Sequence, residues 1–288
     1  MSQWLVIGAA GMLGRDLTAA LARMGEEVTS VTRSELDITD RIAVLTAVKE
    51  HGPQVVVNCA AWTAVDDAEA REKEALQVNG NGAGYVAEAC AGNGARLVHV
   101  STDYVFSGDG TRPYREDDSP APRTAYGRTK LAGERAVYRE LGDAVYVVRT
   151  AWLYGAHGPN FIRTMIRLEQ ERSAVDVVDD QRGQPTWTVD VASQIIALVQ
   201  ADAPGGFYHA TSSGETTWYG LAREVFRLLG ADEDRVRPVS SGQYPRPTPR
   251  PAYSVLGHDA WTVAGIKSAD DWRTAVRRAF PALSRLAS

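Results

Sequence analysis

The chain has 288 residues, of which 44% are hydrophobic and 23% charged, values typical of an ordinary globular protein. Its formal net charge is −5 and no long basic run appears, so we do not expect it to bind nucleic acid. No apolar run is long enough to span a bilayer, and the N-terminal stretch lacks the basic flank of a signal peptide. The two cysteines, Cys59 and Cys90, are isolated, which argues against a disulfide framework and suits a reducing compartment. We therefore expect a cytoplasmic protein with no membrane partner.

Short apolar runs alternate with helical patterns along the first half of the chain. We expect strands at residues 4–7, 27–31, 54–59, 96–100 and 144–149, and helices at residues 16–25, 42–50, 74–92 and 126–140. Strands that alternate with helices in this way form a parallel sheet with helices on both faces. The expected fold class is therefore α/β, with a Rossmann-like, doubly wound parallel sheet.

The second half of the chain has a weaker rhythm and predicts a smaller lobe. We expect helices at residues 161–171, 186–200 and 218–229, a late strand at 205–209 and a stiff, proline-rich loop at 244–251. Residues 1–150 would form a dinucleotide-binding domain and residues 151–288 mainly a C-terminal substrate-binding lobe, with a segment at about 180–205 returning to the first domain. Four tryptophans are expected to pack within the lobe: Trp187, Trp218, Trp261 and Trp272.

A glycine-rich turn lies directly between the first expected strand and the helix that follows it. In the stretch GAAGMLG, Gly8, Gly11 and Gly14 have the context that a dinucleotide-binding motif requires. Glycine permits the tight turn, lets the backbone approach a pyrophosphate and allows the helix to pack closely. The free N–H groups at the start of the helix would then face the phosphates. We interpret the turn as a binding site for NAD(P).

The end of the second strand bears on the choice of cofactor. An acidic side chain at this point would bind a ribose 2′-hydroxyl and favour NAD, whereas Arg33 follows the strand in this chain. An arginine can pair with a 2′-phosphate through its planar guanidinium, so we expect NADPH. Asp37 follows shortly and could reach the adenine, which keeps NADH open.

Three residues form a candidate catalytic group. Tyr126 and Lys130 are four residues apart, so on a helix they share one face. A nearby ammonium favours the phenolate and lowers the pKa of a tyrosine. Thr102 lies just past the strand at 96–100, at the edge where ligands bind in a doubly wound sheet, and its hydroxyl could bond a substrate carbonyl.

The motifs GAAGMLG, STDYVFSG and YGRTK together resemble the extended short-chain dehydrogenase/reductase family. More narrowly, VVVNCAAWTAVDDAE, AYGRTKLAGE, RTAWLYGAHGPNFIRTM and DDQRGQPTW resemble the dTDP-4-dehydrorhamnose reductase family, and the similar segments extend over most of the chain. The resemblance implies that Tyr126 donates a proton, that Lys130 orients the nicotinamide ribose and lowers the pKa of Tyr126, and that Thr102 binds the reacting oxygen.

The resemblance also implies the remaining ligand contacts. Cofactor contacts would come from Gly11, Met12 and Leu13 at the pyrophosphate, Asp37 and Ile38 near the adenine, and Ala61, Trp62 and Thr63 along the dinucleotide. Substrate contacts would come from Asp103 and Trp152, with Tyr104 beside them. Because the substrate is anionic and the chain acidic, local cations are needed as well, and Arg182 and Arg250 are our candidates for the diphosphate.

The implied reaction is the reduction of the C4 ketone of a dTDP-6-deoxy-4-ketohexose, here dTDP-4-dehydro-L-rhamnose to dTDP-L-rhamnose. Some relatives hold magnesium between subunits through glutamates, whereas this chain has Arg15 or Asp16 at the early helix position. That difference puts the metal and the dimer built on it in question, so we assign no metal ligand and leave Mg²⁺ and a homodimer open.

Three other functions stay open from the sequence. The first is a ketoreductase for another dTDP-deoxysugar, of the dihydrostreptose type. The second is a redox-neutral nucleotide-sugar epimerase or dehydratase, although dehydratases carry Thr-Asp-Glu where this chain has Tyr104 as the third residue and so lacks the carboxylate. The third is a non-catalytic, NADP-binding regulatory protein, which would not need Thr102, Tyr126 and Lys130 together.

Overall fold

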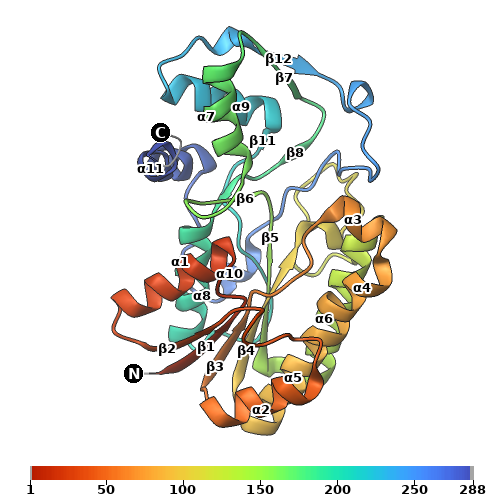
Figure 1. Ribbon diagram of the computed structural model, residues 1–288, viewed down its shortest axis with the longest axis vertical. Coiled ribbons are helices and arrows are strands. Elements are labelled where there is room, and N and C mark those ends of the chain that lie inside the picture. Colours follow the sequence, from red (N-terminus) through yellow and green to blue (C-terminus); the bar gives the residue numbers. More distant parts are fainter. Residues whose placement is uncertain (1, 286–288) are drawn as a thin grey trace.

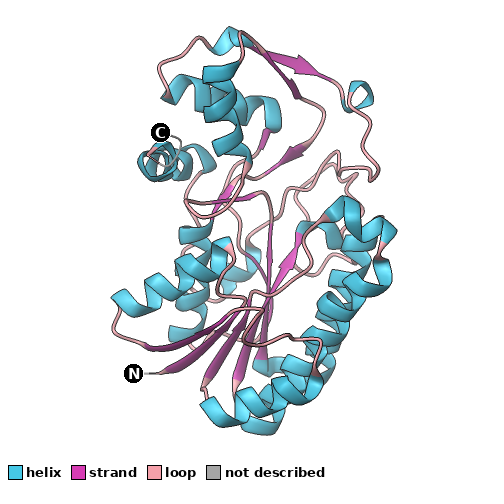
Figure 2. Ribbon diagram, viewed as in Figure 1, coloured by secondary structure: helices cyan, strands magenta, loops and turns pink. Residues whose placement is uncertain are grey.

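The computed structural model describes residues 2–285, and its centre is a six-stranded parallel sheet (Figures 1 and 2). The strand order is β10-β5-β4-β3-β1-β2, and every neighbouring pair is parallel. The strands are β1 (Gln3–Ile7), β2 (Glu27–Val31), β3 (Val55–Asn58), β4 (Arg96–Thr102), β5 (Val145–Thr150) and β10 (Gly206–His209). The order reverses beside β1, which confirms the predicted doubly wound α/β fold.

Helices cover both faces of the sheet (Figure 1). On one face lie α1 (Met12–Arg23), α8 (Thr188–Gln200) and α10 (Asp259–Val263), whose apolar side chains share a core with the sheet. On the other face lie α2 (Arg41–His51), α5 (Ala83–Asn93) and α6 (Ala125–Leu141). Strands β1, β3 and β5 are mostly apolar on both sides, as burial of both faces requires. Within the described residues, no helix is both long and apolar enough to cross a bilayer.

Trp261 belongs to the sheet domain, which corrects the expectation that it packs within the lobe. It lies on α10, is fully buried in the core under α1 and α8, and its indole N–H donates to the His209 carbonyl at 2.8 Å. The chain therefore returns to the sheet three times after β5, through α8, β10 and α10.

The expected helix at 74–92 is divided in the structure. It consists of α4 (Glu72–Leu76), a π-helical turn (Gln77–Gly82) and α5, and it is preceded by α3 (Val65–Ala70). The widened turn directs the Asn79 side chain inward. Its amide oxygen accepts from the Trp62 N–H at 2.8 Å, and its amide nitrogen donates to the Trp62 carbonyl and to the Thr129 hydroxyl, both at 3.1 Å. These three bonds, together with two glycines in the turn, favour the π-helical geometry over a regular α-helix.

The remaining segments form a lobe above the carboxyl ends of the strands (Figure 1). It contains α7 (Phe161–Glu171), α9 (Trp218–Leu228) and α11 (Trp272–Ser284), packed around a core of their own. Short strand pairs complete it: β7 (Val175–Val178) with β12 (Val236–Val239), β8 (Arg182–Gly183) with β11 (Thr216–Thr217), and β6 (Leu153–Tyr154) with β9 (Thr186–Trp187). Trp272 lies in the lobe core, as expected.

Candidate active site

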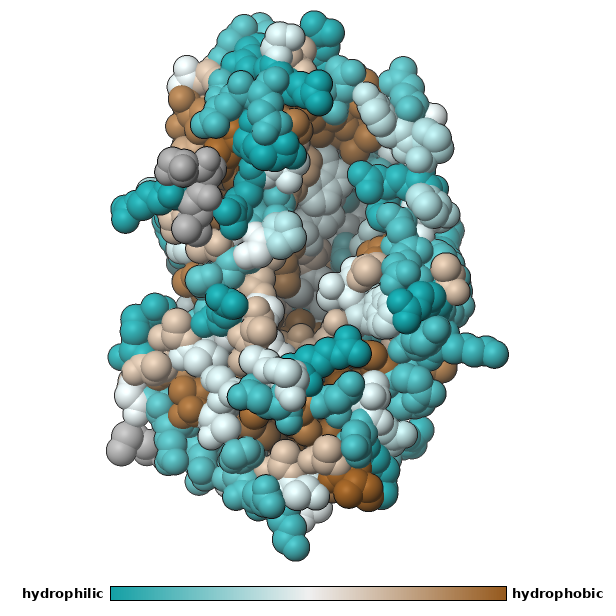
Figure 3. Space-filling view, viewed as in Figure 1, coloured by the Kyte–Doolittle hydropathy of each residue, from teal (hydrophilic) through white to brown (hydrophobic). Residues whose placement is uncertain are grey.

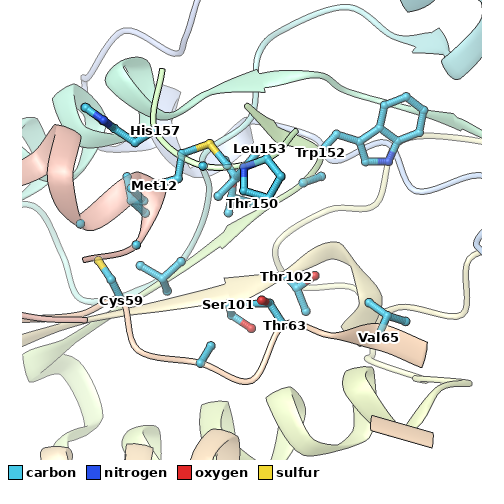
Figure 4. A pocket seen from close by; sticks show the side chains of 18 of the residues that line it. Met12, Cys59, Thr63, Val65, Ser101, Thr102, Thr150, Trp152, Leu153 and His157 are labelled. Atoms are coloured by element: carbon cyan, nitrogen blue, oxygen red, sulfur yellow. The ribbon is translucent and has the colours of Figure 1, made fainter. Parts of the chain in front are cut away.

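A cavity of about 960 Å³ lies between the sheet and the lobe, where the space-filling view is hollowed (Figure 3). The glycine turn after β1, the carboxyl ends of β4 and β5, the first turns of α6 and the segment before α7 all contribute to its wall. In the close-up, Met12 and His157 lie at one end of the cavity and Trp152 at the other (Figure 4). This is the crevice at which doubly wound sheets bind their ligands.

The glycine turn has the geometry of a phosphate cradle. Gly8 has a φ of +80°, and a Cβ atom there would lie 2.7 Å from the Ala60 nitrogen. A Cβ atom on Gly14 would lie 2.5 Å from the Gly8 carbonyl oxygen, so only glycine lets α1 start this close to the turn. Gly11 caps α1 without a side chain, and the first amides of the helix therefore have no side-chain cap. These features fit a dinucleotide pyrophosphate.

The three residues expected near the adenosine lie just past β2 and outside the lining of the cavity. Arg33 is 81% exposed, and its Nε lies 3.8 Å from an Asp37 oxygen. Asp37 accepts hydrogen bonds from the Thr39 amide and hydroxyl, which lower the pKa of its carboxyl group. Ile38 is buried against Gly82 of the π-helical turn. An adenosine in contact with these residues would therefore lie outside the cavity, past the end of β2.

The segment after β3 supplies another part of the wall. Ala61 and Thr63 line the cavity, whereas the Trp62 indole turns away and lies under the Arg71 guanidinium, 4.7 Å from its centre. Asn79 holds the backbone of this segment, as described above. The sequence reasoning missed Asn79, and the unusual repeat NGNG within an otherwise helical stretch was the available signal.

Thr102, Tyr126 and Lys130 all line this cavity. Helix α6 begins at the Thr124 cap and passes so close to the turn after β4 that a Cβ atom on Gly127 would lie 2.2 Å from the Tyr104 oxygen. The close approach brings the Tyr126 hydroxyl near enough to Thr102 to affect the pKa of the phenol. All three side chains are at least 90% buried, at 5%, 9% and 2% exposure respectively.

The electrostatics differ from the sequence prediction in one respect. Burial raises the pKa of Tyr126 to about 12, with Asp103 adding to the rise and the Thr102 hydrogen bond opposing it. Lys130 is not among the groups that shift this pKa, and its Nζ donates to the Val100 carbonyl at 2.7 Å. Burial lowers the pKa of Lys130 itself to about 8, and the Glu134 carboxylate opposes the change. Tyr126 is therefore a fully protonated donor at neutral pH.

Asp103 controls the direction of the Thr102 proton. The Thr102 hydroxyl donates to the Asp103 carboxylate at 3.0 Å and accepts from the Tyr104 amide at 3.2 Å. A hydroxyl has one proton, so Thr102 must rotate away from Asp103 before it can donate to a substrate oxygen. Burial raises the pKa of Asp103 to about 6, which weakens its competition for that proton as the pH falls.

A second cavity of about 640 Å³ adjoins the first, under the lobe. Tyr104 and Trp152 line both cavities and therefore stand between them. Trp152 has a φ of +46°, a left-handed conformation that costs a large residue about 1–3 kcal/mol. Its indole stacks on Trp218, with ring centres 3.6 Å apart and planes at 5°. Trp218 thus faces the second cavity, whereas the sequence suggested only lobe packing.

The two arginines proposed for the diphosphate have different positions. Arg250 lines the second cavity and bonds both oxygens of Asp66, at 2.8 and 2.9 Å, across the crevice from the lobe loop to α3. Arg182 lines neither cavity, because its exposed side chain pairs with Glu215 at 3.0 Å. The structure therefore does not bring Arg182 to the site.

The structure also shows the surroundings of Arg15 and Asp16, the residues at the start of α1 that were considered for metal binding. Asp16 accepts a hydrogen bond from Thr188 and lies 3.7 Å from the His157 ring nitrogen, while the Arg15 side chain donates to the Ala10 carbonyl. Among residues 2–285, no group of three or more His, Cys, Asp and Glu side chains is arranged to hold a metal ion. The polar groups around Asp16 are thus engaged in holding α1 to α8 and to the lobe.

Comparison with known proteins assigns the chain to a family. Residues 2–285 match the family model described as the RmlD substrate binding domain. Two Streptomyces proteins are each 58% identical: the dTDP-4-keto-6-deoxy-D-glucose reductase of S. niveus, over 98% of this chain and 98% of that protein, and the dTDP-4-dehydrorhamnose reductase of S. griseus, over 98% and 94%. The crystal structure of the Bacillus anthracis dTDP-4-dehydrorhamnose reductase in complex with NADP is 36% identical, with a TM-score of 0.93, and covers 97% of this chain and 99% of that chain. The chain therefore belongs to the dTDP-4-dehydrorhamnose reductase family of NAD(P)-dependent oxidoreductases.

Proposed function

We propose that this protein uses NADPH to reduce the C4 ketone of a dTDP-6-deoxy-4-ketohexose, and that its substrate is dTDP-4-dehydro-L-rhamnose. The observation that carries the proposal is the meeting of Thr102, Tyr126 and Lys130 in one cavity with the glycine turn. This grouping provides a proton donor, a polar contact for the ketone oxygen and a cation beside a dinucleotide cradle. We expect the enzyme in the cytoplasm, because Cys59 and Cys90 are both free thiols.

The side chains of the site have distinct tasks in this reaction. When bound, the reduced nicotinamide supplies the hydride to the ketone carbon. Tyr126 holds its proton until negative charge develops on the ketone oxygen and then donates it as a general acid. Thr102 rotates from Asp103 to hydrogen-bond the same oxygen. Lys130, whose ammonium is held by the Val100 carbonyl, orients the nicotinamide ribose. The glycine turn and the segment 61–63 hold the dinucleotide in register with these groups.

A reductase consumes one NADPH for each product, and this separates it from its rivals. The purified protein is expected to oxidise NADPH, followed by the loss of nicotinamide absorbance, only when dTDP-4-dehydro-L-rhamnose is added, and to form dTDP-L-rhamnose in equal amount. A redox-neutral epimerase or dehydratase would change the sugar without consuming NADPH. A regulatory protein would bind NADPH without turnover of any ketosugar.

A second candidate substrate follows from one comparison. The S. niveus relative, named as a reductase of dTDP-4-keto-6-deoxy-D-glucose, is as similar to this chain as the S. griseus relative. Overall identity thus does not distinguish between the two ketosugars. We expect kcat/KM to be higher for the L-rhamnose precursor, and a reversal of this order would assign the chain to the other sugar.

Arg33 provides a test of the cofactor preference. Replacing Arg33 with Ala is expected to raise KM for NADPH about tenfold, because one charge-assisted bond to the 2′-phosphate is lost, and to leave KM for NADH unchanged. Initial rates with each cofactor measure both constants. Arg23→Ala, at the far end of α1, is the matched control. An equal change for both cofactors would show that Arg33 does not read the 2′-phosphate.

The pKa of Lys130 predicts the alkaline limb of the pH profile. Because burial lowers this pKa to about 8, Lys130 is cationic below that pH and neutral above it. We therefore expect kcat/KM for the cofactor, which reports the free enzyme, to decrease as the pH rises through about 8. A profile that stays flat to pH 10, measured with the protein still folded, would show that the reaction does not need this charge.

A further inference from the structure

Trp152 occupies the neck between the two cavities, opposite Tyr104. It follows directly on β5, two residues after Thr150, so its backbone belongs to the sheet domain. Tyr104 is fixed on its side of the neck by an edge-to-face contact with Tyr126, with ring centres 5.4 Å apart. A ligand longer than either cavity must therefore pass between two aromatic side chains that lie next to the catalytic group.

Two residues of the lobe contact the Trp152 indole. A Cβ atom at Gly183 would lie 2.5 Å from Trp152 Cε2, so only glycine leaves room for the indole there. Trp218 stacks on the indole, and the centre of the Phe161 ring lies 4.7 Å from that of Trp218. The pairing of β8 with β11 brings Gly183 and Trp218 close together, because Gly183 pairs with Thr216 and Trp218 lies two residues after Thr216.

The left-handed backbone conformation of Trp152 indicates that contacts with surrounding residues hold it in an unfavourable geometry. Within residues 2–285, the other non-glycine residue with a positive φ is Asp202, in the turn after α8. Trp152 is only half-buried, so hydrophobic burial alone does not require the conformation. The close fit between Gly183 and Trp218 supplies the restraint that keeps the indole at the neck.

We propose that Trp218 and Gly183 are positioning residues, which hold the Trp152 indole as a fixed wall of the neck and so determine which face of the sugar ketone is turned to the nicotinamide while its oxygen lies at Tyr126. The proposal rests on the proposed function and adds to it the control of product stereochemistry. The sugar would lie in the first cavity with its nucleotide beyond the neck, so a wall that can tilt would let the ring enter in two orientations. The two orientations expose opposite faces of C4 and give products that are epimers at C4.

Two substitutions disturb the wall in opposite ways. Trp218→Leu removes the stacking partner and lets the indole tilt into the second cavity. Gly183→Ala adds a methyl group where Trp152 now lies and pushes the indole toward the neck. For both variants we expect KM for the sugar nucleotide to rise about threefold to tenfold, as for the loss of one aromatic stacking contact, KM for NADPH to stay unchanged, and the C4 epimer to appear in the product. Trp218→Phe keeps a ring in place and is expected to restore the values of the native protein.

Trp187→Phe is the matched control, because this half-buried lobe tryptophan packs against Arg278 and lines neither cavity. A merely structural role for Trp218 predicts a different pattern: Trp218→Leu would lower Tm but leave KM for the sugar nucleotide and the C4 configuration of the product as in the native protein. That pattern, with Gly183→Ala also giving a single epimer, would overturn the proposal.

A spectroscopic measurement separates this proposal from the proposed function. In protein labelled with 5-fluorotryptophan, the ¹⁹F resonance of Trp152, identified by its loss in Trp152→Phe, reports the ring current of the stacked Trp218. We expect this resonance to shift in Trp218→Leu and Gly183→Ala but not in Trp187→Phe. The measurement requires no turnover, so a native protein that reduces no ketosugar would remove the proposed function alone. An unshifted resonance in both variants would contradict the positioning of Trp152.

Discussion

Replacing Tyr126 with Phe is expected to lower kcat by about 10²–10⁴-fold, the usual contribution of a general acid, while the Kd for NADPH stays within about twofold. Phe keeps the ring that packs against Tyr104 and the small apolar cluster under α3, so the fold and the cofactor cleft are preserved. Only the hydroxyl proton is lost. Stopped-flow or steady-state rates with the ketosugar measure kcat, and fluorescence titration measures the Kd.

The structure explains why this effect is expected to be large. With its pKa raised to about 12 by burial, the Tyr126 phenol is protonated at every pH at which the enzyme is expected to work. The Thr102 hydroxyl lies beside it but is engaged by Asp103, and Lys130 is turned to the Val100 carbonyl. Tyr138→Phe is the matched control, since Tyr138 lies on the same helix and is 43% exposed. A Tyr126→Phe variant that keeps more than about a third of the native kcat would remove Tyr126 as the acid.

Replacing Glu134 with Gln is expected to lower the free energy of unfolding by about 3–5 kcal/mol, because it leaves a buried guanidinium without its counter-ion. Glu134 and Arg149 are 1% and 2% exposed, and their two hydrogen bonds measure 2.9 and 2.8 Å. Glu134 also accepts from the Ser101 hydroxyl at 2.6 Å, and Ser101 lines the cavity next to Thr102. Urea denaturation of the native and variant proteins measures the difference.

Two further variants make this result specific to burial. Glu72 and Arg128 form a similar pair with two hydrogen bonds, but their side chains are 42% and 44% exposed. Glu72→Gln is therefore expected to lower the free energy of unfolding by only about 0–1 kcal/mol. The double change Glu134→Gln with Arg149→Met removes the stranded charge as well and is expected to recover part of the loss. Equal costs for Glu134→Gln and Glu72→Gln would show that the buried pair does not stabilise the fold in this way.

Much of the fold could be predicted because its elements have strong local signals. The alternation of buried runs and helical patterns placed β2 at 27–31 and α7 at 161–171 with the bounds that the structure has. The π-helical turn was not predictable in the same way, since it depends on Asn79 bonding a backbone segment that lies 17 residues earlier in the chain. Trp261 was placed in the wrong core because its partner, the His209 carbonyl, is distant in sequence.

In the candidate site, too, local features could be predicted and contacts between distant residues could not. Tyr126 and Lys130 could be paired from their helical spacing, and Thr102 from its place at the end of a strand. The direction of the Lys130 side chain could not, because the Val100 carbonyl that receives it belongs to another element. The contacts of Trp152 with Gly183 and Trp218 likewise depend on the pairing of β8 with β11, which no local sequence pattern predicts.

The most direct test of the central claim is isotopic transfer during one complete reaction. The protein is given dTDP-4-dehydro-L-rhamnose and NADPH that carries deuterium at the transferable C4 position of the nicotinamide, and the sugar product is analysed by mass spectrometry and NMR. Our account predicts one deuterium per product molecule, bound to C4 of dTDP-L-rhamnose, and an initial rate of transfer lower by about 10²–10⁴-fold with Tyr126→Phe. Conversion of the sugar without deuterium at C4, or with NADPH left unconsumed, would contradict it.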